Sequence, residues 1–382
     1  MNASFDVVIV GGGVTGAAVG YGLAKRGVKT CLVDAVPTFS RASRANMGLI
    51  WCQSKALGCP QFVRWGFASS RAYGKLAAEL KELSGIDTGY APTGGIIPCL
   101  GEAELEARAQ FIEKLRAETE DGTYPASVLS RKELEGMLPK VPFGPEVSGG
   151  IWSDMDGYVD PLHLMFAFRK SFVRLGGTLF AGERVSEVKP SGRTLECGKA
   201  VLAAGLGVRK LAAQLGTDIP VFPNKSQVML LERIPADVLP IPLLGIARTF
   251  GGTVMIGAAH ENMGMDRRLT PEVLAANAQW AVRVWPELER KRILRFWTGL
   301  RVWPKDAYPI YDRIPGHENA FVFAMHSAVS LAAILEQALP DYVMGKPLPP
   351  DGAIFGLSRF AGGGSGFQGS AASSPHAEAP NK

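Results

Sequence analysis

The chain has few residues that could form disulfides or bind a metal. Of its 382 residues, 5 are cysteine and 5 are histidine. The cysteines, at positions 31, 52, 59, 99 and 197, form no Cys-x-x-Cys pair, and the histidines form no His-Glu-x-x-His pattern. This spacing excludes a disulfide scaffold and predicts no metal site. Thiols that need no partner are typical of a reducing compartment, so we expect a cytoplasmic protein.

A strong net charge and a long apolar run are also missing. The formal net charge is +5, from 41 basic and 36 acidic residues. Because the basic residues are scattered, nucleic-acid binding is not indicated. The most apolar early stretch, residues 7–23, is interrupted by Gly11-Gly12-Gly13 and has no basic segment before it, so neither a secretory signal nor a membrane span is expected. Residues 361–382 contain few large apolar side chains, which predicts a disordered tail.

Glycine, by contrast, is abundant, and one group of glycines has an informative context. Gly11-x-Gly13-x-x-Gly16 follows a β-branched run at residues 5–10 and opens a helical pattern, and Asp34 ends the next predicted strand. Such a β-α-β unit is typical of dinucleotide binding, because the glycines permit a tight turn and a close approach of pyrophosphate to the helix N-terminus. Asp34 would accept hydrogen bonds from a ribose, and its charge disfavours NADP.

The rest of the chain alternates between helical and strand patterns without a fixed repeat, which predicts an α/β fold. Helices are expected at residues 17–26, 67–83, 105–118, 131–138, 161–175, 271–284 and 328–338, with Asp160 as the N-cap of the fifth. Strands are expected at residues 28–33, 178–181, 184–188, 200–203, 228–231, 253–257 and 320–325.

Three further motifs follow the glycine turn in order. They are Ser43-Arg44-Ala45-Asn46-Met47-Gly48-Leu49, then Ala203-Ala204-Gly205, then Gly299-Leu300-Arg301-Val302-Trp303-Pro304. With the glycine turn, they cover roughly residues 5–345 and resemble the D-amino-acid oxidase superfamily of flavoproteins, the group of glycine and sarcosine oxidases. Within this group, residues 46–53 and 326–331 most resemble the flavin subunit of opine oxidases and hydroxyproline dehydrogenases.

This resemblance implies a Rossmann-like FAD-binding domain and a second, mainly antiparallel β substrate domain. The first would be discontinuous, formed by residues 1–85, 152–218 and 305–360, and the second would contain residues 86–151 and 219–304. FAD would be held without a covalent bond, because no cysteine lies beside Arg301. The FAD-binding residues that the resemblance implies are Gly11, Gly13, Val14, Thr15, Gly16, Asp34, Ala35, Ser43, Arg44, Asn46, Met47, Gly48, Leu49, Val185, Ala204, Gly205, Ser327, Ala328, Val329 and Ser330.

The resemblance also implies the chemistry. The arginine of the Gly-Leu-Arg run holds the substrate carboxylate in this superfamily, so Arg301 is the predicted carboxylate-binding residue. His326 is predicted to help stabilise the negative charge of the reduced flavin, together with the N–H groups of residues 327–330. The expected reaction oxidises the C–N bond of an amino or imino acid, such as proline, hydroxyproline, an opine or glycine, with hydride transfer from Cα to the flavin.

The subfamily resemblance implies a multi-subunit dehydrogenase, in which a partner flavoprotein and an iron–sulfur subunit accept the electrons. Sarcosine oxidases activate oxygen with a lysine at a position that corresponds approximately to Met255, and this difference favours a dehydrogenase. A hydrogen-peroxide-forming amino-acid oxidase is the alternative.

Some residues depart from the superfamily pattern near the expected flavin ring. They are Met325, Ser330 and the run Pro309-Ile310-Tyr311-Asp312. These departures keep open a non-catalytic subunit that binds FAD for assembly, and a nicotinamide-linked dehydrogenase is a further alternative. No role is predicted for His260. The tryptophans expected in the core are Trp51, Trp297 and Trp303.

Overall fold

The first elements of the chain form as the glycine motif predicts. The computed structural model describes residues 4–35, 42–120, 122–186, 195–257, 259–364 and 366. Strand β1 (Ser4–Val10) leads through the glycine turn into helix α1 (Val14–Lys25), and strand β2 (Thr30–Asp34) follows. β1 and β2 are parallel, with Val7 opposite Thr30 and Val10 opposite Val33.

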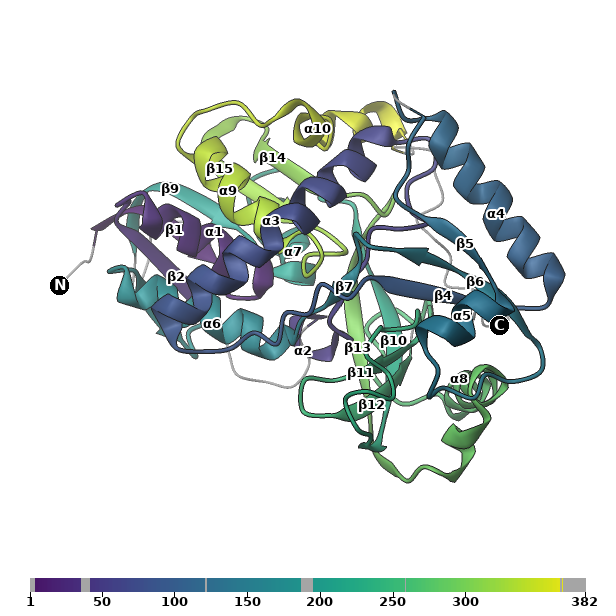
Figure 1. Cartoon of the computed structure of the whole chain (residues 1–382). Helices are drawn as coiled ribbons and strands as arrows, with labels where there is room; N and C mark the ends of the chain where they lie inside the picture. Colours follow the sequence, from purple (N-terminus) through teal and green to yellow (C-terminus); the bar gives the residue numbers. More distant parts are fainter. Residues whose placement is uncertain are drawn as a thin grey trace.

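These strands belong to the parallel sheet, which has the strand order β14-β15-β9-β1-β2-β8. Its other members are β8 (Thr178–Ala181), β9 (Glu196–Leu202), β14 (Ile310–Ile314) and β15 (His317–Ala324). Neighbouring strands are parallel throughout, except that β14 and β15 form an antiparallel pair. Strands from distant parts of the sequence therefore lie side by side (Figure 1).

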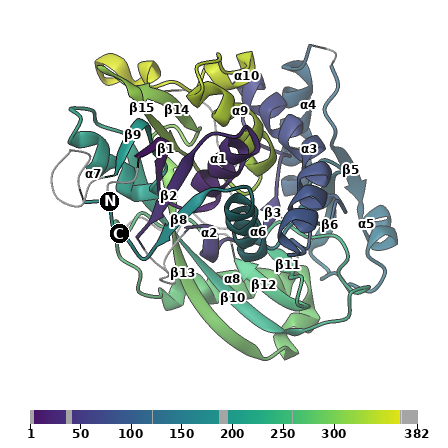
Figure 2. The same ribbon diagram turned by 90° about the vertical axis from the view of Figure 1, so that its left-hand side faces the viewer.

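Helices cover both faces of the parallel sheet. On one face lie α1, α3 (Pro60–Ser84), α6 (Pro161–Arg174) and α9 (Ala332–Val343), and on the other lies α7 (Val208–Ala213), as Figure 2 shows. Side chains alternate along a strand. Val7 and Ile9 of β1 therefore pack with the first group of helices, whereas Val8 and Val10 pack with α7.

The other part of the molecule is built from antiparallel strands. The antiparallel sheet has the order β11-β12-β10-β13, and a smaller sheet has the order β4-β6-β5. Ile96 joins them, because its N–H donates to Pro242 O at 3.0 Å and its carbonyl accepts from Leu244 N at 2.8 Å. The elements of this part are β4 (Gly95–Leu100), α4 (Glu102–Ala117), β5 (Ser127–Ser130), α5 (Arg131–Met137), β6 (Val147–Ser153), β10 (Val221–Arg233), β11 (Ile246–Arg248), β12 (Thr253–Gly257), α8 (Pro271–Val284) and β13 (Ile293–Pro304).

Short elements connect the two parts and end the described chain. Strands β3 (Leu49–Ile50) and β7 (Gly157–Tyr158) pair in antiparallel fashion. The remaining short elements are α2 (Ala42–Ala45), α10 (Pro350–Ala353) and the 3₁₀ helices η1 (Gly205–Gly207), η2 (Pro286–Arg290) and η3 (Leu357–Gly363).

Two sequence-based expectations are corrected here. The strand predicted at residues 184–188 is wrong for residues 184–186, because Gly182, with φ of +90°, turns the chain out of the sheet after β8. Positions 187 and 188 lie outside the described residues. The tail predicted from residue 361 does not begin there, since η3 reaches Gly363 and is anchored by the buried ion pair of Arg359 with Asp306 at 2.7 Å. Apart from residues 364 and 366, the rest of that tail lies outside the described residues.

The arrangement confirms the predicted fold class. Strands of the parallel sheet come from residues 4–34, 178–202 and 310–324, and those of the antiparallel sheets come from residues 95–153 and 221–304. The boundaries predicted for the two domains stay a prediction. Within the described residues, no helix combines the length and the apolar character that crossing a membrane requires.

Candidate active site

The turn between β1 and α1 contains three glycines of the motif, and each position requires glycine for a different structural reason. Gly11 has φ of +109°, and a Cβ there would meet the carbonyl of Ala203. A Cβ on Gly16 would meet the Gly11 carbonyl, so this glycine permits close packing of the helix on the strand. Around Gly13, only Ser43 Oγ would come within 4 Å of a Cβ, at 3.1 Å. The turn is therefore open at Gly13, where a phosphate could approach the N-terminus of α1.

A cleft, which we call the glycine cleft, runs along this turn at the carboxyl ends of the parallel strands. Eleven of the twenty predicted dinucleotide-binding residues line it, whereas Gly16 and Arg44 line neither this cleft nor the cavity described below. The predicted residues that line the cleft are Gly11, Gly13, Val14, Thr15, Asp34, Ala35, Ser43, Val185, Ala204, Gly205 and Ala328. Ser43 Oγ also accepts a hydrogen bond from Val14 N at 3.1 Å, which fixes α2 against the start of α1.

Asp34 has a partner that the sequence analysis missed. Arg169, on α6, forms an ion pair with the Asp34 carboxylate and donates from Nε to the Gly12 carbonyl at 2.9 Å. Both side chains are largely buried. The pair holds Asp34 at the end of β2, where a ribose could reach it. No local pattern links positions 34 and 169, because α6 meets β2 only in the folded sheet.

A second cavity, the inner cavity, opens into the glycine cleft. The two share Ala42, Ser43, Leu300, Val302, Met325 and Ala328 in their linings. The inner cavity lies between the parallel sheet and the antiparallel sheet. The predicted residues that line it are Ser43, Asn46, Met47, Leu49, Arg301, His326, Ser327, Ala328, Val329 and Ser330, and Gly48 is not among its lining residues.

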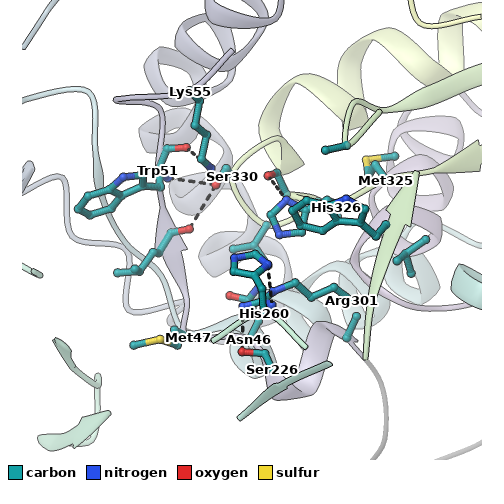
Figure 3. Close-up of a pocket in the computed structure, with 18 of the residues that line it drawn as sticks. Asn46, Met47, Trp51, Lys55, Ser226, His260, Arg301, Met325, His326 and Ser330 are labelled. Carbon is teal, nitrogen blue, oxygen red and sulfur yellow. Dashed lines mark hydrogen bonds between the residues drawn. The ribbon is translucent and has the colours of Figure 1, made fainter. Parts of the chain in front are cut away.

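Arg301, on β13, extends into the inner cavity, and its two Nη atoms make three hydrogen bonds to neutral groups (Figure 3). Nη1 donates to Asn224 Oδ1 and to Ala259 O, both at 2.8 Å, and Nη2 donates to Ser226 Oγ at 2.8 Å. Within the described part of the chain, no carboxylate pairs with this guanidinium. Burial lowers the pKa of Arg301 to about 10, so the side chain remains a cation at neutral pH.

Two histidines and a tryptophan line the cavity beside Arg301. The ring of Trp303 lies close to those of both His260 and His326, with centroid distances of 5.3 Å and 4.6 Å. Nδ1 of His260 lies 3.0 Å from Asn224 Oδ1 and 3.4 Å from Arg301 Nη1. His260, for which no role was predicted, and Trp303, which was expected in the core, are therefore part of the site.

Both imidazoles are held in the neutral form. Burial, and then the positive charge of Arg301, lowers the pKa of His260 to about 3. The same two causes, in the same order, hold the pKa of His326 well below its usual range. The Nδ1 atom of His326 lies 3.0 Å from the Ser327 hydroxyl. A neutral imidazole presents one nitrogen that can accept a hydrogen bond.

The lowered pKa of His260 predicts that the stability of the protein depends on pH. Since the unfolded chain protonates His260 below about pH 6.5 and the folded chain does not, the free energy of unfolding should fall as the pH falls from there towards 3. Between about pH 7 and about pH 5, the free energy of unfolding should therefore fall by about 2 kcal/mol less in His260→Gln than in the wild type. Urea unfolding at both pH values measures this. The exposed His317 offers the control, His317→Gln, which should leave the loss unchanged.

Further cations reach the inner cavity. Lys55 and Arg108, with Arg301, line it, and none of its described lining residues is acidic. Lys55 Nζ donates to Trp51 O at 2.9 Å, and burial lowers the pKa of Lys55. Figure 3 shows Lys55 and Arg301 on opposite sides of His326. The cavity therefore suits an anionic ligand.

The departures from the superfamily pattern make contacts of their own. Ser330 Oγ accepts from Trp51 N at 3.0 Å and donates to Leu49 O at 3.2 Å, so the residue joins the loop after β3 to the turn before α9. Two other departures touch each other, because the Tyr311 hydroxyl donates to Met325 Sδ at 3.7 Å. Met325 and Ser330 line the inner cavity, whereas residues 309–312 line neither cavity.

The two joined cavities fit an elongated dinucleotide. The glycine cleft offers Gly13 and the N-terminus of α1 to a diphosphate and Asp34 to a ribose, and the inner cavity offers the residues of the 46–49 and 327–330 segments to a flavin ring.

None of the five cysteines lines either cavity. Met255 does not line them either, and packs with Met47, Tyr158 and Val228 in an apolar cluster.

Comparison with known proteins gives consistent results. Residues 6–335 match the family model described as "DAO: FAD dependent oxidoreductase". An opine oxidase subunit from Agrobacterium tumefaciens (strain Ach5) is 34% identical over 365 residues, which are 93% of this chain and 97% of that protein. The crystal structure of glycine oxidase from Geobacillus kaustophilus has a TM-score of 0.85 and 26% identity, and the match covers 94% of this chain and 99% of that one. The L-proline dehydrogenase from P. horikoshii shares the fold, with a TM-score of 0.81 and 20% identity over 95% of this chain and 100% of its own.

Proposed function

The chain belongs to the DAO family of FAD dependent oxidoreductases, and from this premise we propose that it is the catalytic subunit of a multi-subunit dehydrogenase of amino or imino acids. FAD is its cofactor, and oxidation of amino or imino acids is its class of reaction. The proposed substrates are proline or hydroxyproline, an opine, or a glycine-like amine. All of these carry a carboxylate beside a primary or secondary amine.

Arg301 is the observation that carries this proposal. Its guanidinium lies in the inner cavity, is bound only by neutral acceptors within the described chain, and keeps its charge. A substrate carboxylate would supply the missing anion through two parallel hydrogen bonds. The neutral His260 and His326 can accept a hydrogen bond from the substrate amine. Bound FAD supplies the acceptor for the hydride that leaves Cα.

We also propose that other subunits take the electrons onward. The relative from Agrobacterium tumefaciens is named as one subunit of an opine oxidase, which supports an assembly with further subunits. The cysteines of this chain have no cluster spacing, so an iron–sulfur centre would belong to a partner, beside a partner flavoprotein. All five cysteines are free, which supports a cytoplasmic location.

Anaerobic reduction of the bound flavin tests the proposal. The purified yellow protein is mixed under nitrogen with proline, hydroxyproline, glycine, sarcosine and an opine, each in both enantiomers where they exist. At least one compound should bleach the flavin absorbance. If every compound fails while dithionite still bleaches it, the chain binds FAD without oxidising amino acids, as a non-catalytic subunit would.

A hydrogen-peroxide-forming oxidase is the second candidate, and Lys55 favours it. Oxygen must accept two electrons and two protons to become hydrogen peroxide, and a nearby cation stabilises the negative charge that develops. Met255 cannot provide that charge, but Lys55 lines the inner cavity. The chain would then need no electron-accepting partner.

Replacing Lys55 by methionine separates the two candidates. In an oxidase, this change should slow the reoxidation of the reduced protein by oxygen about 100-fold, because one preorganised cation is lost. Stopped-flow mixing of the reduced protein with oxygenated buffer measures the rate. Lys75→Met, at a lysine on α3 whose side chain is 81% exposed, is the control. Equal rates in the wild type and Lys55→Met would remove the support for the oxidase.

A further inference from the structure

One segment in the part of the molecule built from antiparallel strands lines both cavities. It consists of residues 259–270, between β12 and α8, and we call it the strap. At one end, Ala259 O accepts from Arg301 Nη1, and His260 lies beside the same guanidinium. Further along, Met265 and Arg267 line the glycine cleft, which the glycine turn of residues 11–13 also lines.

A buried ion pair holds the strap in this position. Lys225 Nζ, on β10, lies 3.1 Å from Glu261 Oε2, and the two side chains are 1% and 4% exposed. Thr270 Oγ1 donates to Glu261 Oε2 at 2.7 Å, and Gln227 Nε2 donates to Glu261 Oε1 at 2.8 Å. Because every charged atom here has partners, the network can fix the backbone firmly against β10.

The middle of the strap is also fixed, at the residue that faces the cleft. Thr298 Oγ1, on β13, donates to the Arg267 carbonyl at 2.8 Å. The main chain of Arg267 is thus tied to the antiparallel sheet while its exposed side chain borders the glycine cleft.

Two adjacent arginines in the strap differ in a way that indicates a role. Arg268 forms an ion pair with Asp266, with Nη2 to Oδ2 at 2.8 Å, and does not line the glycine cleft. Arg267 lines that cleft, and no carboxylate pairs with it within the described residues. A guanidinium that lines a cleft and has no carboxylate partner there can bind a phosphate through two donors.

We propose that Arg267 binds the diphosphate of FAD from the strap, across the cleft from the glycine turn. FAD would then be held from both parts of the molecule. Binding of the diphosphate would also add a contact between the glycine cleft and the strap, which carries Ala259 and His260. Bound FAD would in this way contact, through Arg267, the same segment whose other end lies beside Arg301. The inference rests on the cofactor and does not depend on which substrate is oxidised.

Titration of the full-length protein, freed of flavin, with FAD tests the contact. Arg267→Gln should raise the Kd of FAD at least about 10-fold at low salt, because one charge-assisted contact is lost. Arg268→Gln is the matched control and should bind FAD like the wild type. Riboflavin, which has no phosphate, should bind the wild type and Arg267→Gln equally. Equal Kd values of FAD for both proteins, or an equal loss with riboflavin, would overturn the proposal.

Trypsin gives a readout of the strap itself, because it cleaves after arginine. FAD should slow cleavage after residues 267 and 268 at least about 10-fold in the wild type, whereas riboflavin should not. Arg268→Gln, which retains the site after Arg267, should keep this protection. Arg267→Gln, which retains the site after Arg268, should lose most of it at saturating FAD. If FAD protects Arg267→Gln as fully as the wild type, the cofactor does not fasten the strap through Arg267.

Discussion

Replacing Arg301 by lysine is expected to weaken substrate binding roughly 10- to 150-fold, although the positive charge is kept. Lysine cannot supply two parallel donors to a carboxylate, and the loss of one charge-assisted hydrogen bond costs about 1.5–3 kcal/mol. Arg301→Ala should lose more, since the substrate carboxylate would then lie without its guanidinium partner beside Trp303 and the neutral His260. Anaerobic titration of flavin reduction measures the affinity.

The control for this experiment is on the same strand. Arg295 is exposed on β13 and does not line the inner cavity, so Arg295→Ala should be reduced like the wild type. FAD content should stay near normal in all the variants, because the glycine cleft is unchanged. If Arg301→Ala is reduced at the same substrate concentration as the wild type, another residue binds the carboxylate, and Lys55 or Arg108 is then the next candidate.

The second large effect is expected at the glycine turn, where Gly13→Val should abolish FAD binding. A Cβ at this position would lie 3.1 Å from Ser43 Oγ, and the added branch of valine would occupy the open side of the turn. A phosphate could then no longer approach the N–H groups at the start of α1. The flavin absorbance of the purified variant, relative to its protein absorbance, measures the loss.

A glycine elsewhere provides the matched control. Gly136, on α5, has no positive φ and no atom within 4 Å of a Cβ, so Gly136→Val should bind FAD normally. Circular dichroism should show that both variants fold. Normal FAD content in Gly13→Val would mean that the glycine turn has only a structural role.

Helices and strands whose formation depends on interactions between residues close in the sequence are predicted from the sequence. The helix predicted at residues 271–284 is α8, and the strand predicted at 253–257 is β12, with the same bounds. Asp160 caps α6 as expected, because its Oδ1 accepts from the N–H groups of residues 162 and 163, both at 2.9 Å. Capping and periodicity operate within a few residues, and one chain segment therefore contains the whole signal.

The polar surroundings of Arg301 could not be predicted in the same way. Asn224 is opposite Arg301 because β10 and β13 pair in a particular register, and Ser226 lies two residues further along β10. His260 arrives from the strap. Nothing in the sequence near position 301 indicates these partners, because the pairing joins residues 77 positions apart in the chain. Only the Gly-Leu-Arg run, through family resemblance, pointed to the arginine itself.

The position of β1 in the middle of the parallel sheet has a consequence for synthesis on the ribosome. β1 needs β9 as a neighbour, and α1 is tied to α9 by the hydrogen bond of Arg26 with Asp341, 315 positions later in the chain. The first βαβ unit therefore leaves the exit tunnel long before its partners are translated. Until then, an uncovered strand edge and an apolar helix face are exposed to other nascent chains. We expect ribosome-bound chains that stop before residue 341 to depend on chaperones for solubility, which the completed chain does not.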